Sequence, residues 1–357
     1  MKTPLLLIGS LFIVASQANA QTNSGFYGLV DAGLTYVNNQ GGNSSVILDT
    51  GIMQANRFGW RGTEDLGGGL KALYQLEGGF ALDTGVLGQG GAIFGRTAAV
   101  GLLGTWGTVT LGRQYDFMLD NIVLKSSGAV FAGVYGFRRL DIDRIAGEQF
   151  NNAIKFVSPN YAGFTAGILY GLSEVPGAAG GAPNAPRTES AGVNYASGPL
   201  NLGLAYTNVN GSGGSLAESV LGANAMRHYG FGASYGFASG LLFGNATNTR
   251  ASVEAGNKST VVDNYEVGYN YKTSPATTVG LAYTYSRWDV TKYNQINLAG
   301  HYFLSKRTDV YAGAYYQKSS DINAPVGMFL IVNPATNKGY SSNENQLALR
   351  IGMRHTF

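Results

Sequence analysis

The sequence contains no cysteine, only 9 prolines in 357 residues, and few charged side chains. Without cysteine no disulfide can form, so backbone hydrogen bonds and packing must stabilise the fold. Charged residues make up 13% of the chain, whereas soluble globular proteins average about 25%. The 24 basic and 21 acidic residues nearly balance, which argues against nucleic acid or an anionic lipid surface as a partner.

Long hydrophobic runs are missing beyond the N-terminus, although 45% of the residues are hydrophobic. A membrane-spanning helix needs about 20 apolar residues in succession. The apolar run from Leu5 to Val14 is too short for this; it follows the basic Lys2 and precedes a small-residue site at Ala18 to Ala20. This layout predicts a cleaved secretory signal peptide over residues 1–20 and a mature chain over 21–357.

Glycine and aromatic residues are abundant, with 53 Gly, 22 Tyr and 17 Phe. Many short segments alternate apolar and polar residues: Phe58 and Trp60, for example, face away from Arg57 and Arg61. Alternation with a period of two is typical of barrels whose strands face lipid on one side and a lumen on the other. In an exported chain without apolar helices, it predicts a closed all-β transmembrane antiparallel barrel, which pairs every backbone polar group between strands.

We count sixteen such segments along the mature chain, which form a single domain and end with Asn345 to Phe357. An even number returns both termini to the periplasmic side. Seven connections are short turns rich in Gly, Pro, Ser and Asn, and eight are mostly longer. Short periplasmic turns and long extracellular loops are the expected asymmetry. A soluble β-sandwich or propeller is the alternative, but the low charge content disfavours it.

One long segment, Gln114 to Phe150, does not alternate. Its first part, Tyr115 to Leu124, has apolar residues at helix-like intervals, and Phe137 to Arg144 carries five charges in eight residues. A compact domain rarely carries so long a connection unless it is functional. We therefore predict that this segment folds inward and narrows the barrel.

Six stretches in order along the mature chain resemble general diffusion porins of the Gram-negative outer membrane. They are Phe26 to Gly33, Asn56 to Gly67, Phe94 to Gly101, Leu111 to Tyr115, Asn152 to Pro159 and Arg350 to Phe357. The resemblance implies a homotrimer of sixteen-stranded barrels, each with a water-filled pore for small hydrophilic solutes and ions, set among outer-membrane lipid and lipopolysaccharide. It also implies that the third loop forms the constriction and that Phe357 is an assembly signal; a residue of the interfacial aromatic girdle is the plainer interpretation of Phe357.

Basic side chains on the early strands are the candidates for the pore wall. They are Arg57, Arg61, Arg96, Arg113 and Lys155. Alternation points Arg57, Arg61 and Lys155 inward, and the resemblance places Arg57, Arg96 and Lys155 in a basic cluster opposite the third loop. Rim cations in ordinary ion pairs are the alternative.

The inward segment supplies the opposite charge, because its acidic residues outnumber its basic ones by five to four. The acids are Asp116, Asp120, Asp141, Asp143 and Glu148. They either face the basic wall across the lumen or pair within the loop and hold it in place. The basic wall favours a weak preference for anions.

Other functions find less support. The three histidines, His228, His301 and His355, lie on different segments without an evident acid partner, so neither an enzyme nor a metal site is expected. No cofactor motif is recognised. A substrate-specific outer-membrane channel is the main alternative, and an adhesin or a purely structural barrel is another. The sequence assigns no role to the apolar stretch Val326 to Val332 in the eighth loop.

Overall fold

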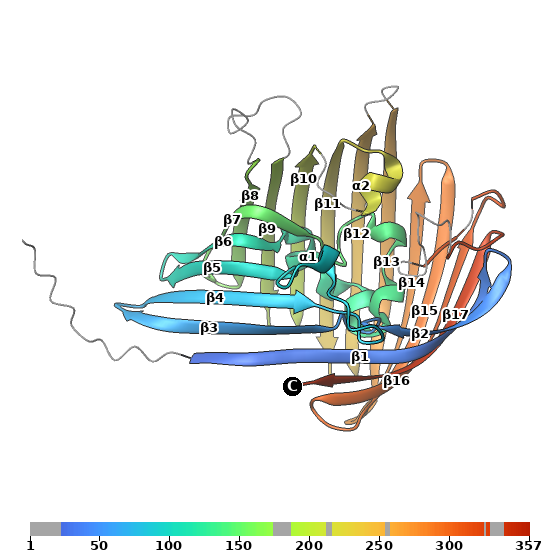
Figure 1. Cartoon of the computed structure of the whole chain (residues 1–357), viewed down its shortest axis with the longest axis horizontal. Helices are drawn as coiled ribbons and strands as arrows, with labels where there is room; N and C mark the ends of the chain where they lie inside the picture. Colours follow the sequence, from blue (N-terminus) through green and yellow to red (C-terminus); the bar gives the residue numbers. More distant parts are fainter. Residues whose placement is uncertain (1–22, 174–186, 212–215, 254–257, 325, 329–338) are drawn as a thin grey trace, which may run out of the picture.

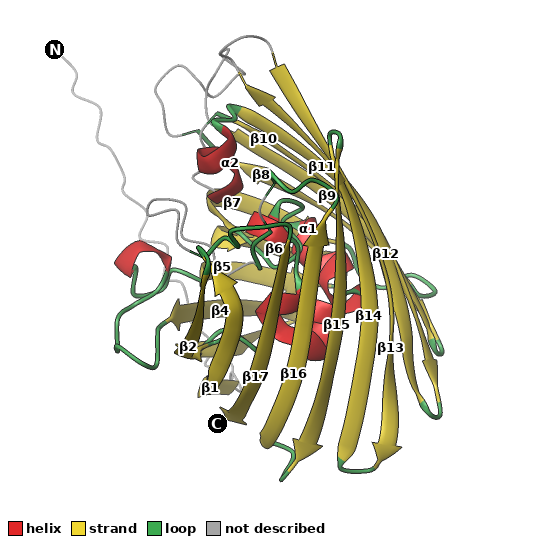
Figure 2. Ribbon diagram, turned by 90° about the vertical axis from the view of Figure 1, so that its right-hand side faces the viewer, coloured by secondary structure: helices red, strands yellow, loops and turns green. Residues whose placement is uncertain are grey.

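The computed structural model describes residues 23–173, 187–211, 216–253, 258–324, 326–328 and 339–357. The predicted signal peptide, residues 1–20, lies outside the described residues. The strands form one antiparallel sheet that curves into a barrel (Figures 1 and 2). They are β1 (Asn23–Gln40), β2 (Asn43–Thr50), β3 (Arg57–Gly67), β4 (Leu70–Gly79), β5 (Thr97–Gly104), β6 (Gly107–Tyr115), β7 (Gln149–Val157), β8 (Phe164–Gly171), β9 (Arg187–Ser197), β10 (Leu200–Asn210), β11 (Ala225–Phe237), β12 (Gly240–Val253), β13 (Lys258–Ser274), β14 (Thr277–Trp288), β15 (Thr291–Phe303), β16 (Thr308–Ser319) and β17 (Asn345–Thr356).

The helices are short and lie in the connections between strands. They are α1 (Phe117–Ile122), α2 (Leu216–Leu221), η1 (Gln89–Gly91), η2 (Val123–Lys125), η3 (Gly128–Ala132), η4 (Gly133–Gly136) and η5 (Arg139–Asp141). No single helix in the described ranges is long and apolar enough to cross a membrane. One bent pair, Phe117–Lys125 with Gly128–Gly136, passes that test by length and composition only.

Pairing of the first strand with the last closes the sheet. Residues 29–37 of β1 pair with residues 356–348 of β17. On its other edge, β1 pairs with β2 through residues 32–40 and with β3 through residues 23–29. Strands β2 and β3 are therefore two halves of one barrel strand, which is interrupted at residues 51–56. The predicted sixteen-stranded barrel is confirmed, but the predicted second strand, Arg57 to Arg61, omitted the β2 half.

The predicted alternation is visible in the exposure of single strands. On β15, Ile296 and Leu298 are exposed on the outer face, whereas the alternate residues Asn297 and Ala299 are buried. Outward apolar side chains suit contact with hydrocarbon, and the polar residues are left to the interior. The barrel therefore presents an apolar outside and an inside on which polar groups can be placed.

The segment between β6 and β7 lies against the inner wall (Figure 2). Helix α1 contacts β8 to β11, and η3 contacts β14 and β15. Glycines on the wall make room for the segment: a Cβ at Gly192 would lie 2.3 Å from the Asn121 side chain, and one at Gly280 would lie 2.2 Å from the Phe131 ring. The inner wall is thus shaped to hold this one connection.

The tip of the segment meets the break between β2 and β3. The Val134 N–H donates to the Ile52 carbonyl over 2.6 Å. The break is held in turn by Asp31, whose carboxylate accepts from the Met53 N–H at 2.6 Å. Val326 and Met328 of the eighth loop are also buried, Met328 in the cluster that contains Phe131. The described part of the apolar stretch therefore turns inward, whereas residues 329–332 lie outside the described residues.

Buried ion pairs tie the segment to β13. The Arg138 guanidinium lies 2.6 Å from Glu266 and 3.2 Å from Asp143, and both of its partners are fully buried. Glu266 also accepts from the Ser127 N–H at 2.7 Å. Charges buried in this way are stable only when all partners are present. Arg138 therefore holds two parts of the segment to one wall residue.

Removing this cation should loosen the segment without opening the barrel. We expect Arg138→Met to destabilise docking of the segment by about 3–5 kcal/mol, because two carboxylates lose their partner in a buried site. Limited proteolysis of the purified protein should then cut the segment, while the heat-modifiable gel mobility of the folded barrel is retained. Arg287→Met, which breaks an Arg287–Asp263 pair with a largely exposed guanidinium, is the control and should leave the segment resistant. A segment that stays resistant in Arg138→Met would contradict this anchoring role.

Candidate functional site: a cavity between wall and inward segment

A cavity of about 750 Å³ separates the inward segment from the wall of the early and last strands. Three arginines line it, namely Arg57 on β3, Arg96 just before β5 and Arg354 on β17. Arg96 pairs with Glu77 at 2.7 Å, whereas the Nε of Arg57 donates to the carbonyl of Ala55 at 3.0 Å. The wall side of the cavity is therefore cationic and only partly neutralised.

Arg354 pairs with Asp309 at 2.9 Å and donates to the Gln54 side chain at 3.1 Å. It was not among the predicted wall residues. Period-two alternation contains the signal, because Ile351 and Met353 are exposed on the outer face and residues 350 and 354 must then face inward. A prediction restricted to the early strands omits Arg354.

Among the five predicted acids of the segment, only Asp120 lines the cavity. Lys155 lies 2.5 Å from its carboxylate and also donates to the Tyr115 carbonyl at 2.8 Å. The Lys155 ammonium also lies 4.8 Å from the centre of the Phe117 ring. Desolvation by the surrounding segment and wall raises the pKa of Asp120, and the attraction of Lys155 offsets this only in part. The structure thus joins a predicted wall cation to a predicted loop acid.

The other four predicted acids are directed away from the cavity. Asp116 caps α1 by accepting from the Leu119 N–H at 3.3 Å and pairs with Arg144 at 3.2 Å. Glu148 pairs with the same arginine at 2.5 Å. Asp143 pairs with Arg138.

Asp141 accepts from the Ala146 N–H at 2.9 Å, and burial beside Asp143 and Glu148 raises its pKa well above the ordinary value. Together with the three pairs above, this contact belongs to the segment and its docking. These four acids therefore hold the segment in place, which is the second of the two alternatives drawn from the sequence.

Three predicted wall cations do not line the cavity: Lys155, which pairs with Asp120 beside it, and Arg61 and Arg113. The Arg61 guanidinium lies 4.9 Å from the centre of the Tyr27 ring. Arg113 donates to the Gly95 carbonyl at 2.6 Å and to the Asn151 side chain at 2.5 Å. Arg113 is held by contacts at the base of the inward segment and Arg61 by its ring contact on β1. Of the predicted wall cations, only Arg57 and Arg96 therefore line the cavity.

The histidines are structural where the structure shows their contacts. His301 does have an acid partner, Asp309, at 2.8 Å from Nδ1, which corrects the sequence interpretation. Its Nε2 contacts the Phe131 carbonyl at 2.9 Å, so both ring nitrogens are occupied and the side chain anchors the inward segment. Within the described ranges, no group of three or more His, Cys, Asp or Glu side chains is placed to hold a metal ion.

Phe357 lies at the seam where the barrel closes. Its ring lies exposed on the outside, 5.9 Å from the ring of Phe26. Its backbone pairs with Gly28 in both directions, at 3.0 and 3.1 Å. This position suits an interfacial aromatic residue, and its role as an assembly signal stays a prediction.

A closed antiparallel barrel with an apolar outside and a charged cavity inside defines a membrane channel of the outer-membrane type. Residues 7–322 match the Gram-negative porin family, and the chain belongs to that family. It is 31% identical to outer membrane porin protein 32 of Delftia acidovorans and 28% identical to an outer membrane porin protein of Bordetella pertussis, each over 100% of both chains.

Solved structures agree with this assignment. An anion-selective porin from Comamonas acidovorans has a TM-score of 0.76 at 28% identity, covering 94% of this chain and 100% of the other. A trimer form of the outer membrane protein OmpT of Vibrio cholerae has a TM-score of 0.66 at 15% identity, covering 94% and 99%. At this identity, the likeness to the Vibrio cholerae protein supports only a shared fold. The chain is therefore an outer-membrane diffusion channel, and its family consists of channels rather than enzymes.

The Asp120–Lys155 pair should make the charge of the cavity depend on pH. Because the pKa of Asp120 is raised, its carboxylate takes up a proton at a higher pH than an exposed aspartate does. As pH falls, Asp120 becomes neutral, so the cavity loses a negative charge. We expect the reversal potential in a KCl gradient to move toward anion preference between neutral and acid pH. The Asp120→Asn variant should lose most of that shift; an unchanged pH profile would contradict the assignment.

Proposed function

We propose that this outer-membrane channel passes small hydrophilic solutes and ions by passive diffusion, with a weak preference for anions. The single observation that carries the preference is the composition of the cavity wall: Arg57, Arg96 and Arg354 line it, whereas four of the five acids of the inward segment do not. Fixed cations along a narrow aqueous path raise the local concentration of anions. The similarity to an anion-selective porin supports the same sign.

Neutralising Arg57 should weaken the preference. A unit charge about 7 Å from a passing ion contributes ~0.6 kcal/mol in water. Removing it disfavours chloride and favours potassium by that amount each, so the chloride-to-potassium permeability ratio of Arg57→Gln should fall by about sevenfold. The measurement is the reversal potential of single channels in a KCl gradient. Arg307→Gln, at an exposed turn between β15 and β16, is the matched control and should behave like the wild type. Cation preference of the unmodified channel would overturn the proposal.

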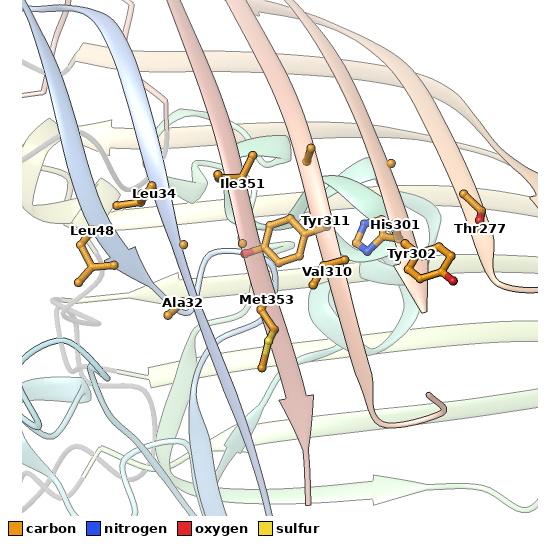
Figure 3. A pocket seen from close by; sticks show the side chains of 14 residues that line it. Ala32, Leu34, Leu48, Thr277, His301, Tyr302, Val310, Tyr311, Ile351 and Met353 are labelled. Carbon is orange, nitrogen blue, oxygen red and sulfur yellow. The ribbon is translucent and has the colours of Figure 1, made fainter. Parts of the chain in front are cut away.

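We further propose that three copies assemble and that each starts at Gln21 after signal-peptide removal. A hollow of about 700 Å³ on the outside of β1, β2 and β15 to β17 supports the first part (Figure 3). The small residues Ala32, Gly300 and Ala312 line it, together with Leu34 and Met353. An apolar hollow of this size suits interlocking with a second copy better than fluid hydrocarbon chains. A solved structure with the same fold also has a trimer form, which agrees with an assembly of three copies.

Native mass spectrometry of the detergent-solubilised protein tests both parts in one measurement. We expect a species of three copies, each with the mass of residues 21–357. Replacing Ala312 with the larger Phe should fill the hollow and shift the population toward monomers, because overpacking prevents close approach. A monomer that persists at all concentrations, or subunits that retain residues 1–20, would contradict the respective part. Lipopolysaccharide as the outer surrounding stays a prediction from the resemblance.

A further inference from the structure

The face that the inward segment turns toward the cavity is mostly apolar. Leu119 on α1, Val123 and Leu124 on η2, Ala129 on η3 and Val134 on η4 all line the cavity. Leu124 is 62% exposed. We call these five residues the apolar strip. Opposite them on the wall stand the three arginines described above, so the cavity has one cationic side and one apolar side.

The apolar strip is not a by-product of packing the segment against the wall. A different set of apolar side chains does that packing: Met118, Ile122 and Phe131 are almost completely buried, and Met118 and Ile122 lie against the wall glycine Gly230. Leu124 contributes nothing comparable to that contact, because most of its side chain faces open space. A water-filled passage gains hydration from polar residues at such positions, so exposed apolar residues there need another reason.

Burial against the wall also explains why the strip carries so little charge. Lys125, next to Leu124, points the other way: it is 2% exposed, and its ammonium donates to the Asn121 carbonyl at 2.5 Å and to the Asn194 side chain at 3.1 Å. Asp120 is the one acid of the segment beside the strip, and Lys155 holds it at 2.5 Å. A solute in the cavity therefore meets the three wall arginines on one side and hydrocarbon on the other.

We propose that the cavity is a transient binding site for amphipathic organic anions, meaning a carboxylate or similar anionic head on a short apolar body. The head would accept hydrogen bonds from Arg57 and Arg354, and the body would cover Val123 and Leu124. Such a solute satisfies both sides of the cavity at once, whereas chloride or acetate satisfies only the arginines. This inference deepens the proposed function and rests on its anion preference.

The proposed site rejects solutes that match only one of its two sides. A cation with the same apolar body gains the same contact with the strip but brings its charge to the arginines, which repel it. A neutral solute with the same body lacks the head that the guanidiniums bind. The combination of the two halves, rather than either alone, defines the class.

The test compares hexanoate with acetate as inhibitors of chloride current through the purified full-length mature channel in planar bilayers. We expect hexanoate to halve the current at a concentration about tenfold lower than acetate, which is less than full burial of the additional methylenes would give because the strip stays partly wet. Hexylammonium, with the same chain and the opposite charge, should inhibit no better than acetate. Equal inhibition by hexanoate and acetate, or by hexanoate and hexylammonium, would overturn the inference.

Three variants tie the effect to the apolar strip. Leu124→Asn keeps the size of the side chain and should reduce the hexanoate-to-acetate ratio from about ten to about two, whereas Leu124→Met should retain it. Val123→Thr, almost isosteric, should lower the ratio in the same direction and guards against a folding defect at position 124. A ratio that is unchanged in both polar variants would refute the role of the strip.

The KCl reversal potential of the same channels separates the two proposals. If the channel prefers chloride but does not distinguish hexanoate from acetate, the amphipathic site fails and the anion channel stands. If the channel prefers potassium, the proposed anion preference fails first.

Discussion

The structure depends on the pairing of β1 with β17. In hydrocarbon an unpaired backbone N–H or carbonyl has no water to bind, so a sheet that spans the membrane must have no free edge. The pairing extends to the last residue, where the backbone of Phe357 bonds Gly28 in both directions. Closure divides the side chains of each strand into an outer apolar set and an inner set free of lipid. The inward-facing side chains are the ones that a solute inside the barrel can contact.

Closure alone makes a wide tube, and the inward segment occupies part of its interior. The wall accommodates this segment sterically, with glycines such as Gly192 and Gly280 at the contacts, and electrostatically, with Glu266 facing Arg138. The electrostatic part has a consequence for the lumen. Acids that hold the segment in place, such as Asp116 and Asp143, no longer face the passage. The electric field in the cavity is therefore set by the charges that do not take part in docking the segment.

The sequence predicts the barrel well because lipid imposes one simple rule, alternation, on every strand. The same rule points Arg57 inward and, applied to the last strand, also reveals Arg354. It does not reveal β2, because Ile47, between the exposed Val46 and Leu48, is apolar as well and packs against the cluster that contains Phe131 of the segment. It says nothing about the inward segment, which has no lipid-facing side. There the partner of Arg138 is Glu266, 128 residues away, and no local pattern in either stretch indicates that they meet.

This difference explains why a count of charges could not give the sign of the passage. Five acids against four bases suggests a slightly negative segment, yet only Asp120 reaches the cavity, and Lys155 holds it there. On the wall, Glu77 forms a salt bridge with Arg96 and Asp309 forms one with Arg354. Arg57 donates instead to a backbone carbonyl. The balance at the cavity is consequently positive, although the segment as a whole is not. Under the proposed anion preference, selectivity depends on which charges remain uncompensated at the cavity. The docking contacts on the far side of the segment decide that, because they pair acids such as Asp116 and Asp143 away from it.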